Sequence, residues 1–359
     1  MPDDASANRA LLSARLTAQR LTTPRATGVV ETTRHLLAVQ AQDPRAARLA
    51  IRARTRDGHS SEVDQALTGE RSLIITWANR GTLHLIAAED EPLLHALTTP
   101  QLRTGSDRRL AQEGVTPAAT ARGLAAIRRA LTDAPMTRGQ LRDVLQRADV
   151  PVAGQALVHV LYRATLEGLI VRGPLIDGEH AFVLAADWLG ARPRVDRERA
   201  LAELARRYLA AHGPADERDL AKWAQLTLRD ARAALGAIAG ELVEWPQGLL
   251  DLRRPPHRGR DAPALPPPRL LGPFDPLLLG WRSRELILAG AEEVVTANGM
   301  FKAIALIDGR ARGTWTLPGG RVALNLWGSP DAATTRALER EATAVQAYLT
   351  PRDPARGAG

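Results

Sequence analysis

Residues 73–86 read LIITWANRGTLHLI. The apolar and β-branched segments 73–77 and 82–86 flank Ala78-Asn79-Arg80-Gly81, a short link with turn-forming residues. This pattern predicts a β-hairpin. Apolar residues at helical spacing precede the hairpin. Helices followed by a hairpin are typical of a winged helix.

The order of helices and then paired strands returns twice further along the chain, without a fixed sequence period. We therefore expect three tandem winged-helix motifs, at residues 1–117, 118–192 and 193–255. The expected helices are 9–20, 29–40, 45–54, 118–132, 137–147, 154–167, 197–211, 219–225 and 227–238, and the expected strand pairs after the first are 168–173 with 180–184 and 242–245 with 249–252.

The chain after the third motif has a different composition. A linker rich in Pro and Arg spans 253–268, and β-prone segments with the hairpin-type dipeptides Asn298-Gly299 and Asp308-Gly309 follow. We expect strands at 301–307 and 313–317, a closing helix at 329–349 and a loose tail from 351 to 359, all within a last region at 256–359. The predicted fold class is α+β, with three winged helices followed by a small β-rich domain.

Composition narrows the class of protein. The chain has 359 residues, 45% of them hydrophobic and 25% charged, which are ordinary values for a folded protein of two or three domains. The absence of Cys excludes disulfides, thiolate metal sites and a cysteine nucleophile. No signal peptide or long apolar run is present, so we expect a cytoplasmic protein without a membrane partner.

The charge points to a polyanionic partner. The formal net charge is +8 and the sequence pI is about 10.8. Lys222 and Lys302 are the only lysines, so arginine carries nearly all the positive charge. Its planar group grips phosphates and base edges. A GC-rich genome would also favour arginine, but it does not cancel the net charge.

Common enzyme motifs are missing. The sequence has no phosphate-binding Gly-rich loop, no GxSxG segment and no spacing of metal ligands. We therefore expect no cofactor and no metal. His257-Arg258-Gly259-Arg260 lies in the Pro-rich linker, and its context is that of a solvated loop.

The segment Gln40-Ala41-Gln42-Asp43-Pro44 is the most informative local feature. Gln40 falls on the apolar face of the predicted helix 29–40, so it should be partly buried. Asp43 followed by Pro44 is typical of an N-cap and the first turn of a new helix. Both glutamine amides could therefore face one cleft, although geometry alone favours their capping of helix-end carbonyls.

The helix predicted after this junction carries a basic stripe. Arg45, Arg48 and Arg52 recur at spacings of three and four residues. A polyanion passing the glutamines would meet this stripe, although such a stripe is commonly a solvated helix face.

The sequence resembles the AlkZ and YcaQ family of winged-helix DNA glycosylases along nearly its whole length. Four segments in the family's order carry the resemblance: Val-Gln-Ala-Gln-Asp-Pro-Arg (39–45), Arg-Gly-Thr-Leu-His-Leu (80–85), His-Gly-Pro-Ala (212–215) with Asp219-Leu220-Ala221-Lys222-Trp223, and Leu-Gly-Pro-Phe-Asp-Pro-Leu-Leu-Leu-Gly (271–280) with Asn298-Gly299-Met300-Phe301. Gln40-Ala41-Gln42 is similar to the Gln-x-Gln subtype, called AlkZ-like.

The resemblance implies three winged helices and a β-rich domain around a DNA-binding cleft in a C-shaped molecule. It also implies excision of N7-alkylated purines, unhooking of azinomycin-type interstrand crosslinks, and catalysis by Gln40 and Gln42. The partner would be damaged double-stranded DNA, bound by a monomer that associates with the nucleoid.

Further site residues are expected around this pair. DNA would be held by Arg45, Arg48, Arg52 and Arg80, with Arg282 as a weaker candidate. His84, in the second hairpin strand, is either a core histidine or part of the active site. We assign Asp43 to helix capping.

Two other functions fit the same sequence. A winged-helix transcription regulator would bind DNA without removing a base. A resistance protein that sequesters a drug would bind free azinomycin and not alkylated DNA.

Overall fold

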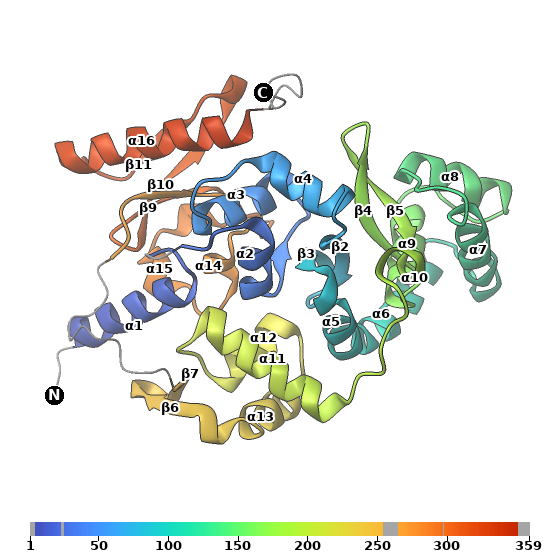
Figure 1. The fold of residues 1–359 in the computed structure, drawn as a ribbon, viewed down its shortest axis with the longest axis horizontal. Helices are drawn as coiled ribbons and strands as arrows, with labels where there is room; N and C mark the ends of the chain where they lie inside the picture. The colour runs from blue at the N-terminus through green and yellow to red at the C-terminus, as the bar shows by residue number, and fades with distance from the viewer. Residues whose placement is uncertain (1–3, 23–24, 254–264, 297, 351–359) are drawn as a thin grey trace. The chain divides into compact units, whose positions relative to one another are not determined.

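The computed structural model describes residues 4–22, 25–253, 265–296 and 298–350 (Figure 1). The chain divides into two compact units. Unit 1 combines residues 1–63 with 201–359, and unit 2 comprises residues 64–200. Most of the predicted linker, including His257-Arg258-Gly259-Arg260, and the predicted tail lie outside the described residues.

Unit 2 is built on an antiparallel sheet in the order β3-β2-β4-β5. The predicted hairpin is confirmed as β2 and β3, with Ile75 opposite Leu85. Its strands consist almost entirely of buried residues, which explains their continuous apolar sequence. The elements of this unit are β2 (Leu73–Ala78), β3 (Thr82–Ala87), α5 (Glu91–Thr98), α6 (Pro100–Gln112), α7 (Pro117–Ala130), α8 (Arg138–Arg147), α9 (Ala156–Leu166), β4 (Ile170–Ile176), β5 (Glu179–Leu184) and α10 (Ala185–Leu189).

Unit 1 brings both ends of the chain together. Its elements before unit 2 are α1 (Asp4–Ala18), α2 (Val29–Leu36), β1 (Val39–Gln40) and α3 (Pro44–Arg54), and α4 (Ser60–Thr68) crosses the boundary. Those after it are α11 (Arg197–His212), which also crosses the boundary, α12 (Glu217–Ala224), α13 (Leu228–Gly236), β6 (Leu242–Trp245), β7 (Leu249–Leu252), β8 (Arg269–Leu271), α14 (Pro276–Leu279), α15 (Glu285–Leu288), β9 (Ile304–Ile307), β10 (Arg310–Thr316), β11 (Ala323–Leu326) and α16 (Ala332–Leu349).

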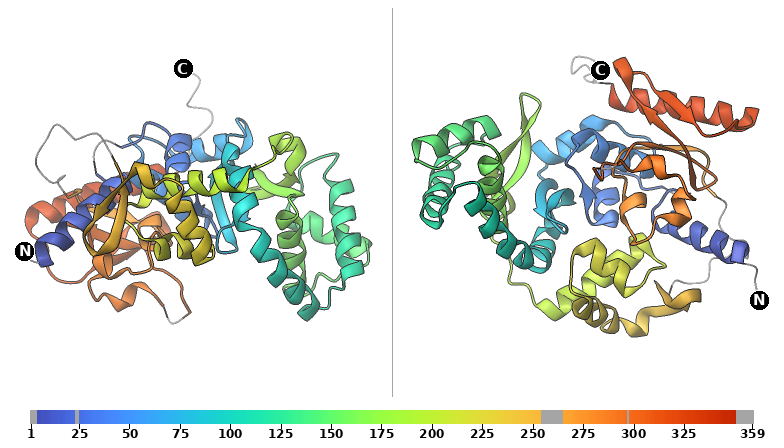
Figure 2. Two further views of the ribbon diagram at one scale, coloured as in Figure 1. Left: turned by 90° about the horizontal axis from the view of Figure 1, so that it is seen from below. Right: turned by 180° about the vertical axis from the view of Figure 1, so that it is seen from behind.

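The last part of unit 1 is a second antiparallel sheet, in the order β11-β10-β9-β8. The predicted turn Asp308-Gly309 joins β9 to β10, and both residues have positive φ (50° and 74°), as a two-residue hairpin turn requires. Helix α16 runs alongside this sheet (Figure 2). Leu49 of α3, Trp315 of β10 and Leu338 of α16 share one buried apolar cluster. The N-terminal and C-terminal parts of the chain therefore share a core.

The α+β fold class is confirmed, but the compact units do not follow the four predicted segments. Residues 1–117, predicted as one winged helix, are divided between the two units. Moreover, β2 pairs with β4, so the first two predicted strand pairs form one sheet. The assignment to winged helices and the expected C shape stay predictions. No helix among the described residues is long and apolar enough to cross a membrane.

Candidate active site

The chain turns sharply between α2 and Gln40. Helix α2 ends at Leu36, and Leu37 has φ 64° and ψ −46°. The N–H of Ala38 donates to the carbonyl of Leu36 at 2.8 Å, which closes a γ-turn with its strained centre at Leu37. The predicted helix over 29–40 is therefore wrong in its last turn. The fully buried Leu37 side chain anchors this turn in the core.

The two glutamine amides are in direct contact. Gln40 is only 8% exposed, and its Nε2 donates to Oε1 of Gln42 at 2.8 Å, whereas Gln42 is exposed. Burial of Gln40 is confirmed, but its cause is a strand and not a helix face. In extended chain, residues two apart point to the same side, so both amides share a face. Among the described residues, the Gln42 side chain bonds only to Gln40 and caps no helix.

A rigid helix begins directly after the pair. The carboxylate of Asp43 accepts hydrogen bonds from the N–H groups of Arg45 and Ala46, at 2.8 and 3.2 Å, and Pro44 is the first helical residue. The assignment of Asp43 to N-capping is confirmed. Gln42 thus lies one residue before a capped helix end, which limits its backbone freedom.

The three arginines of the predicted stripe have different surroundings. Arg45 is exposed, and Arg48 is partly exposed with its guanidinium donating to the carbonyl of Pro44. Arg52 is bound by Glu341 of α16 through two hydrogen bonds of 2.8 and 3.0 Å. Arg45 is therefore the member of the stripe whose guanidinium group binds no carboxylate among the described residues.

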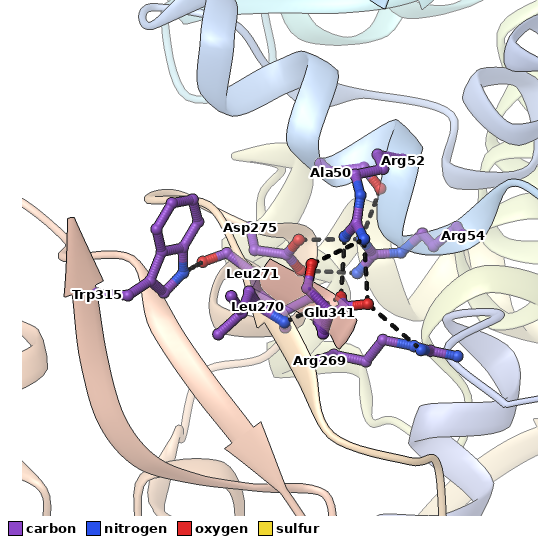
Figure 3. Close-up of polar contacts among 9 residues, drawn as sticks. All are labelled: Ala50, Arg52, Arg54, Arg269, Leu270, Leu271, Asp275, Trp315 and Glu341. Atoms are coloured by element: carbon purple, nitrogen blue, oxygen red, sulfur yellow. Dashed lines mark hydrogen bonds and ion pairs between the residues drawn. The ribbon is translucent and has the colours of Figure 1, made fainter. Parts of the chain in front are cut away.

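A fourth arginine of α3 is fully buried and was missed by sequence reasoning. Arg54 forms a two-point ion pair with Asp275 at 2.7 and 3.0 Å, with both side chains 0% exposed (Figure 3). It also donates to the side chain of Gln19 and the carbonyl of Ala50. The signal was its spacing, since Arg54 follows Ala47 and Ala50 on the buried face of α3.

The predicted candidates Arg80 and His84 belong to unit 2, whereas the glutamines belong to unit 1, so the two groups are described separately. His84 is 1% exposed, and its Nδ1 lies 2.9 Å from the carbonyl of Thr82. Burial, together with the charge of Arg80, lowers the pKa of His84 to about 3. The imidazole is therefore neutral at physiological pH and cannot act as a cationic acid there.

The remaining candidate, Arg282, follows α14 in unit 1. Its side chain is exposed, and its backbone N–H donates to Asp219 at 2.8 Å. Trp281 beside it donates from its indole nitrogen to the carbonyl of His212. The ring of His212 in turn packs against that of Trp223, with ring centroids 5.3 Å apart. The family-like segments at 212–215 and 219–223 therefore pack together with Trp281 and Arg282, which directly follow the segment 271–280, within unit 1.

No group of three or more His, Asp or Glu side chains that could hold a metal ion occurs in the described part of the chain. The site at the start of α3 is thus a pair of neutral amides beside a short basic stripe. Such amides can donate and accept hydrogen bonds and can position a water molecule, but they do not titrate.

Comparison with known proteins assigns the class. The chain belongs to the AlkZ-like family of DNA glycosylases, whose family model matches residues 33–348. It is therefore an enzyme of the class that hydrolyses N-glycosyl bonds.

Two relatives are known in more detail. The interstrand DNA cross-link repair glycosylase of Streptomyces sahachiroi is 28% identical over 346 residues, which cover 90% of this chain and 91% of that protein. The solved structure of the Streptomyces sahachiroi DNA glycosylase AlkZ is similar to this fold, with a TM-score of 0.78 and 25% identity. That match covers 95% of this chain and 96% of the other.

Proposed function

We propose that this protein excises N7-alkylated purines from double-stranded DNA, including the unhooking of azinomycin-type interstrand crosslinks, with Gln40 and Gln42 as the catalytic pair. The observation that carries the proposal is the 2.8 Å contact between the two amides at the surface of unit 1. Family membership and the relative named for interstrand crosslink repair support it.

The chemistry suits neutral amides. Alkylation at N7 gives the purine a formal positive charge, so it can leave without a proton from a general acid. The enzyme then has to position a water molecule at C1′ and offset the positive charge that develops on the sugar. Amide oxygens can do both, because they accept a hydrogen bond from the water and present a negative dipole to the sugar.

The contact between the amides suggests how they divide this work. The N–H of Gln40 occupies one lone pair of the Gln42 oxygen, and a carbonyl oxygen has a second lone pair for water. Gln42 is exposed and can reach substrate, whereas Gln40 is buried and holds Gln42 in place. The strained turn at Leu37 and the cap at Asp43 fix the backbone on both sides of the pair.

DNA binding is proposed to rest on arginine. Arg45 and Arg48 lie on the helix that begins at the glutamines, and Arg80 and Arg282 are further candidates for phosphate contacts. A crosslinked nucleotide cannot swing freely out of the duplex, because the lesion ties it to the other strand. The protein would thus reach the lesion in place as a cytoplasmic monomer that associates with the nucleoid.

The test uses a duplex carrying one N7-methylguanine, incubated with excess enzyme and then cleaved with alkali at abasic sites. Wild type should produce strand breaks far above the spontaneous rate, and Gln40→Ala/Gln42→Ala should not. Gln146→Ala, which removes an exposed glutamine of α8, is the matched control and should behave as wild type. An azinomycin-crosslinked duplex follows as the second substrate.

Four results would contradict the proposal. Full activity in the double variant would remove the glutamines from the mechanism. Tight DNA binding without base loss by wild type would favour a transcription regulator, and affinity for free azinomycin alone would favour a sequestering protein. Efficient removal of undamaged purines would exclude the amide mechanism, since a neutral base leaves only with the help of an acid.

A further inference from the structure

Unit 1 contains a pocket of about 580 Å³ between α3 and α16, on the side of α3 that carries Arg52. Three arginines from separate parts of the sequence line it, namely Arg25, Arg52 and Arg269. Glu341 lies at the same place, and His59 forms part of the wall. Figure 3 shows Arg52 and Arg269 reaching the carboxylate of Glu341 from different elements.

The positive charge of this arginine pocket is only partly neutralised. Glu341 binds Arg52 at 2.8 and 3.0 Å, but the nearest nitrogen of Arg269 is 3.7 Å from its carboxylate. Nε of Arg269 is buried without a hydrogen-bond partner. Among the described residues that line the pocket, the other carboxylate is that of the exposed Asp57.

Arg25 adds a further positive charge to the pocket. Among the residues that the structure describes, none forms a hydrogen bond or ion pair with its side chain. Burial lowers the pKa of Arg269, and the charges of Arg25 and Arg52 lower it further, while Glu341 acts in the opposite direction. Arg25 and Arg52 are thus each close enough to Arg269 for their charges to repel it.

We infer that the arginine pocket binds a phosphate group through Arg25, Arg52 and Arg269. An anion there would supply the missing partner of the buried Arg269 Nε and offset the mutual repulsion of the three cations. Guanidinium groups match phosphate oxygens geometrically and form charge-assisted hydrogen bonds with them. Several arginines around one open pocket are what such a ligand requires.

A DNA strand is the favoured source of the phosphate, and this part of the inference rests on the proposed function. Arg52 lies eight residues after Pro44, so the pocket is about 12 Å along α3 from its start. One DNA strand advances about 3.4 Å per nucleotide along the duplex axis. A phosphate in the pocket would thus be roughly three or four nucleotides from a base at Gln42, and Arg45 and Arg48 lie between them.

The first measurement follows the thermal stabilisation of the whole protein by inorganic phosphate, because a ligand that binds only the folded state raises the melting temperature. Arg25→Ala and Arg269→Ala should reduce phosphate affinity at least threefold. Glu341→Gln, which removes the competing carboxylate, should increase it. Arg340→Ala on the same helix, where the arginine is exposed and outside the pocket, is the matched control and should bind phosphate as wild type does.

The second measurement gives the salt dependence of duplex binding for the same variants. Loss of one phosphate contact makes the negative slope of log K against log salt less steep by about 0.9. We expect that decrease for Arg25→Ala and none for Arg340→Ala. Phosphate binding that depends on Arg25, together with an unchanged DNA slope, would support the pocket but assign it to free phosphate.

The inference is overturned if Arg25→Ala and Glu341→Gln bind phosphate with the affinity of Arg340→Ala. Because Arg25 is partly exposed and its side chain forms no hydrogen bond or ion pair within the described part of the chain, its removal should leave the fold intact even if Arg269→Ala does not fold. The phosphate measurement does not involve base excision. The phosphate-binding result could therefore be interpreted even if the glutamine mechanism were wrong.

Discussion

The buried ion pair between Arg54 and Asp275 makes the sharpest prediction about stability. It joins α3 to the segment before α14, two parts of unit 1 that are far apart in the sequence. Four of the five guanidinium donors of Arg54 are used, two by Asp275 and one each by Gln19 and Ala50, while Nε has no hydrogen-bond partner among the residues that the structure describes. Both charges are removed from water, so each depends on the other.

Removing Asp275 should therefore cost more than a surface salt bridge would. An uncompensated buried charge costs about 3–5 kcal/mol. Asp275 also caps α14 by accepting from the N–H of Leu277 at 2.9 Å, which adds about 1 kcal/mol. We expect Asp275→Ala to lower the free energy of unfolding of unit 1 by about 4–6 kcal/mol. Arg54→Lys should lose about 2–4 kcal/mol, because one ammonium cannot replace the two-point contact.

The assay is urea denaturation monitored by hydrogen exchange, because exchange reports the stability of unit 1 and of unit 2 separately. Peptides from α3 and residues 270–279 should lose protection in Asp275→Ala, and those from β2 should not. Arg56→Ala removes an exposed arginine near the end of α3 and should change stability by less than about 0.5 kcal/mol. A cost below about 1 kcal/mol for Asp275→Ala would refute the reasoning.

Three further predictions concern pH and packing. Burial raises the pKa of Glu341, but hydrogen bonds and charge from Arg52 outweigh burial and hold the pKa below its ordinary value of 4.5. The ionised carboxylate therefore stabilises the fold above pH 4.5, and this contribution is lost as the pH falls. The melting temperature of Glu341→Gln should therefore fall less between about pH 5 and 3 than that of wild type. Single-turnover base excision should be independent of pH from about 5.5 to 8.5, because amides do not titrate and the pKa of His84 is about 3; a midpoint near pH 6.5 in the rate profile would contradict this. Gly280→Ala would place a methyl group 2.5 Å from the ring of buried His212 and should lower the free energy of unfolding by about 1–3 kcal/mol. Gly236→Ala, which has open space around the new methyl group, should not lower it. Equal melting temperatures for the two variants would argue against the clash.

Local signals in the sequence predicted the features that depend on neighbouring residues. Asp43 caps α3 because an Asp-Pro pair fits a helix start, and Asp308-Gly309 forms a tight turn because both residues tolerate positive φ. The hairpin at 73–86 was also predictable, because two apolar, β-branched segments are joined there by a short link of turn-forming residues. In each of these cases the chain within a few residues determines the outcome.

Features that depend on distant contacts could not be read from the sequence. The pattern of α2 would allow the helix to continue to Gln40, whereas in the folded protein the helix ends in a turn whose central residue, Leu37, is fully buried in the core. The partners Asp275 and Glu341 are 221 and 289 residues away from their arginines. The spacing of Arg54 indicates the buried face of α3, but nothing near Arg52 or Arg54 identifies the carboxylate that each of them binds, and so the basic stripe was predicted without Glu341.

The interleaved course of the chain also sets an order of events during synthesis. Unit 2 is continuous and can fold as soon as residues 64–200 have left the ribosome. Residues 1–63 have to wait for β8 to α16 before their apolar side chains and Arg54 find their partners. At about 5–20 residues per second, this delay is roughly 15–60 s. The unit that contains the glutamine segment is therefore completed last, so a polypeptide truncated before α16 would carry Gln40 and Gln42 in an incomplete unit.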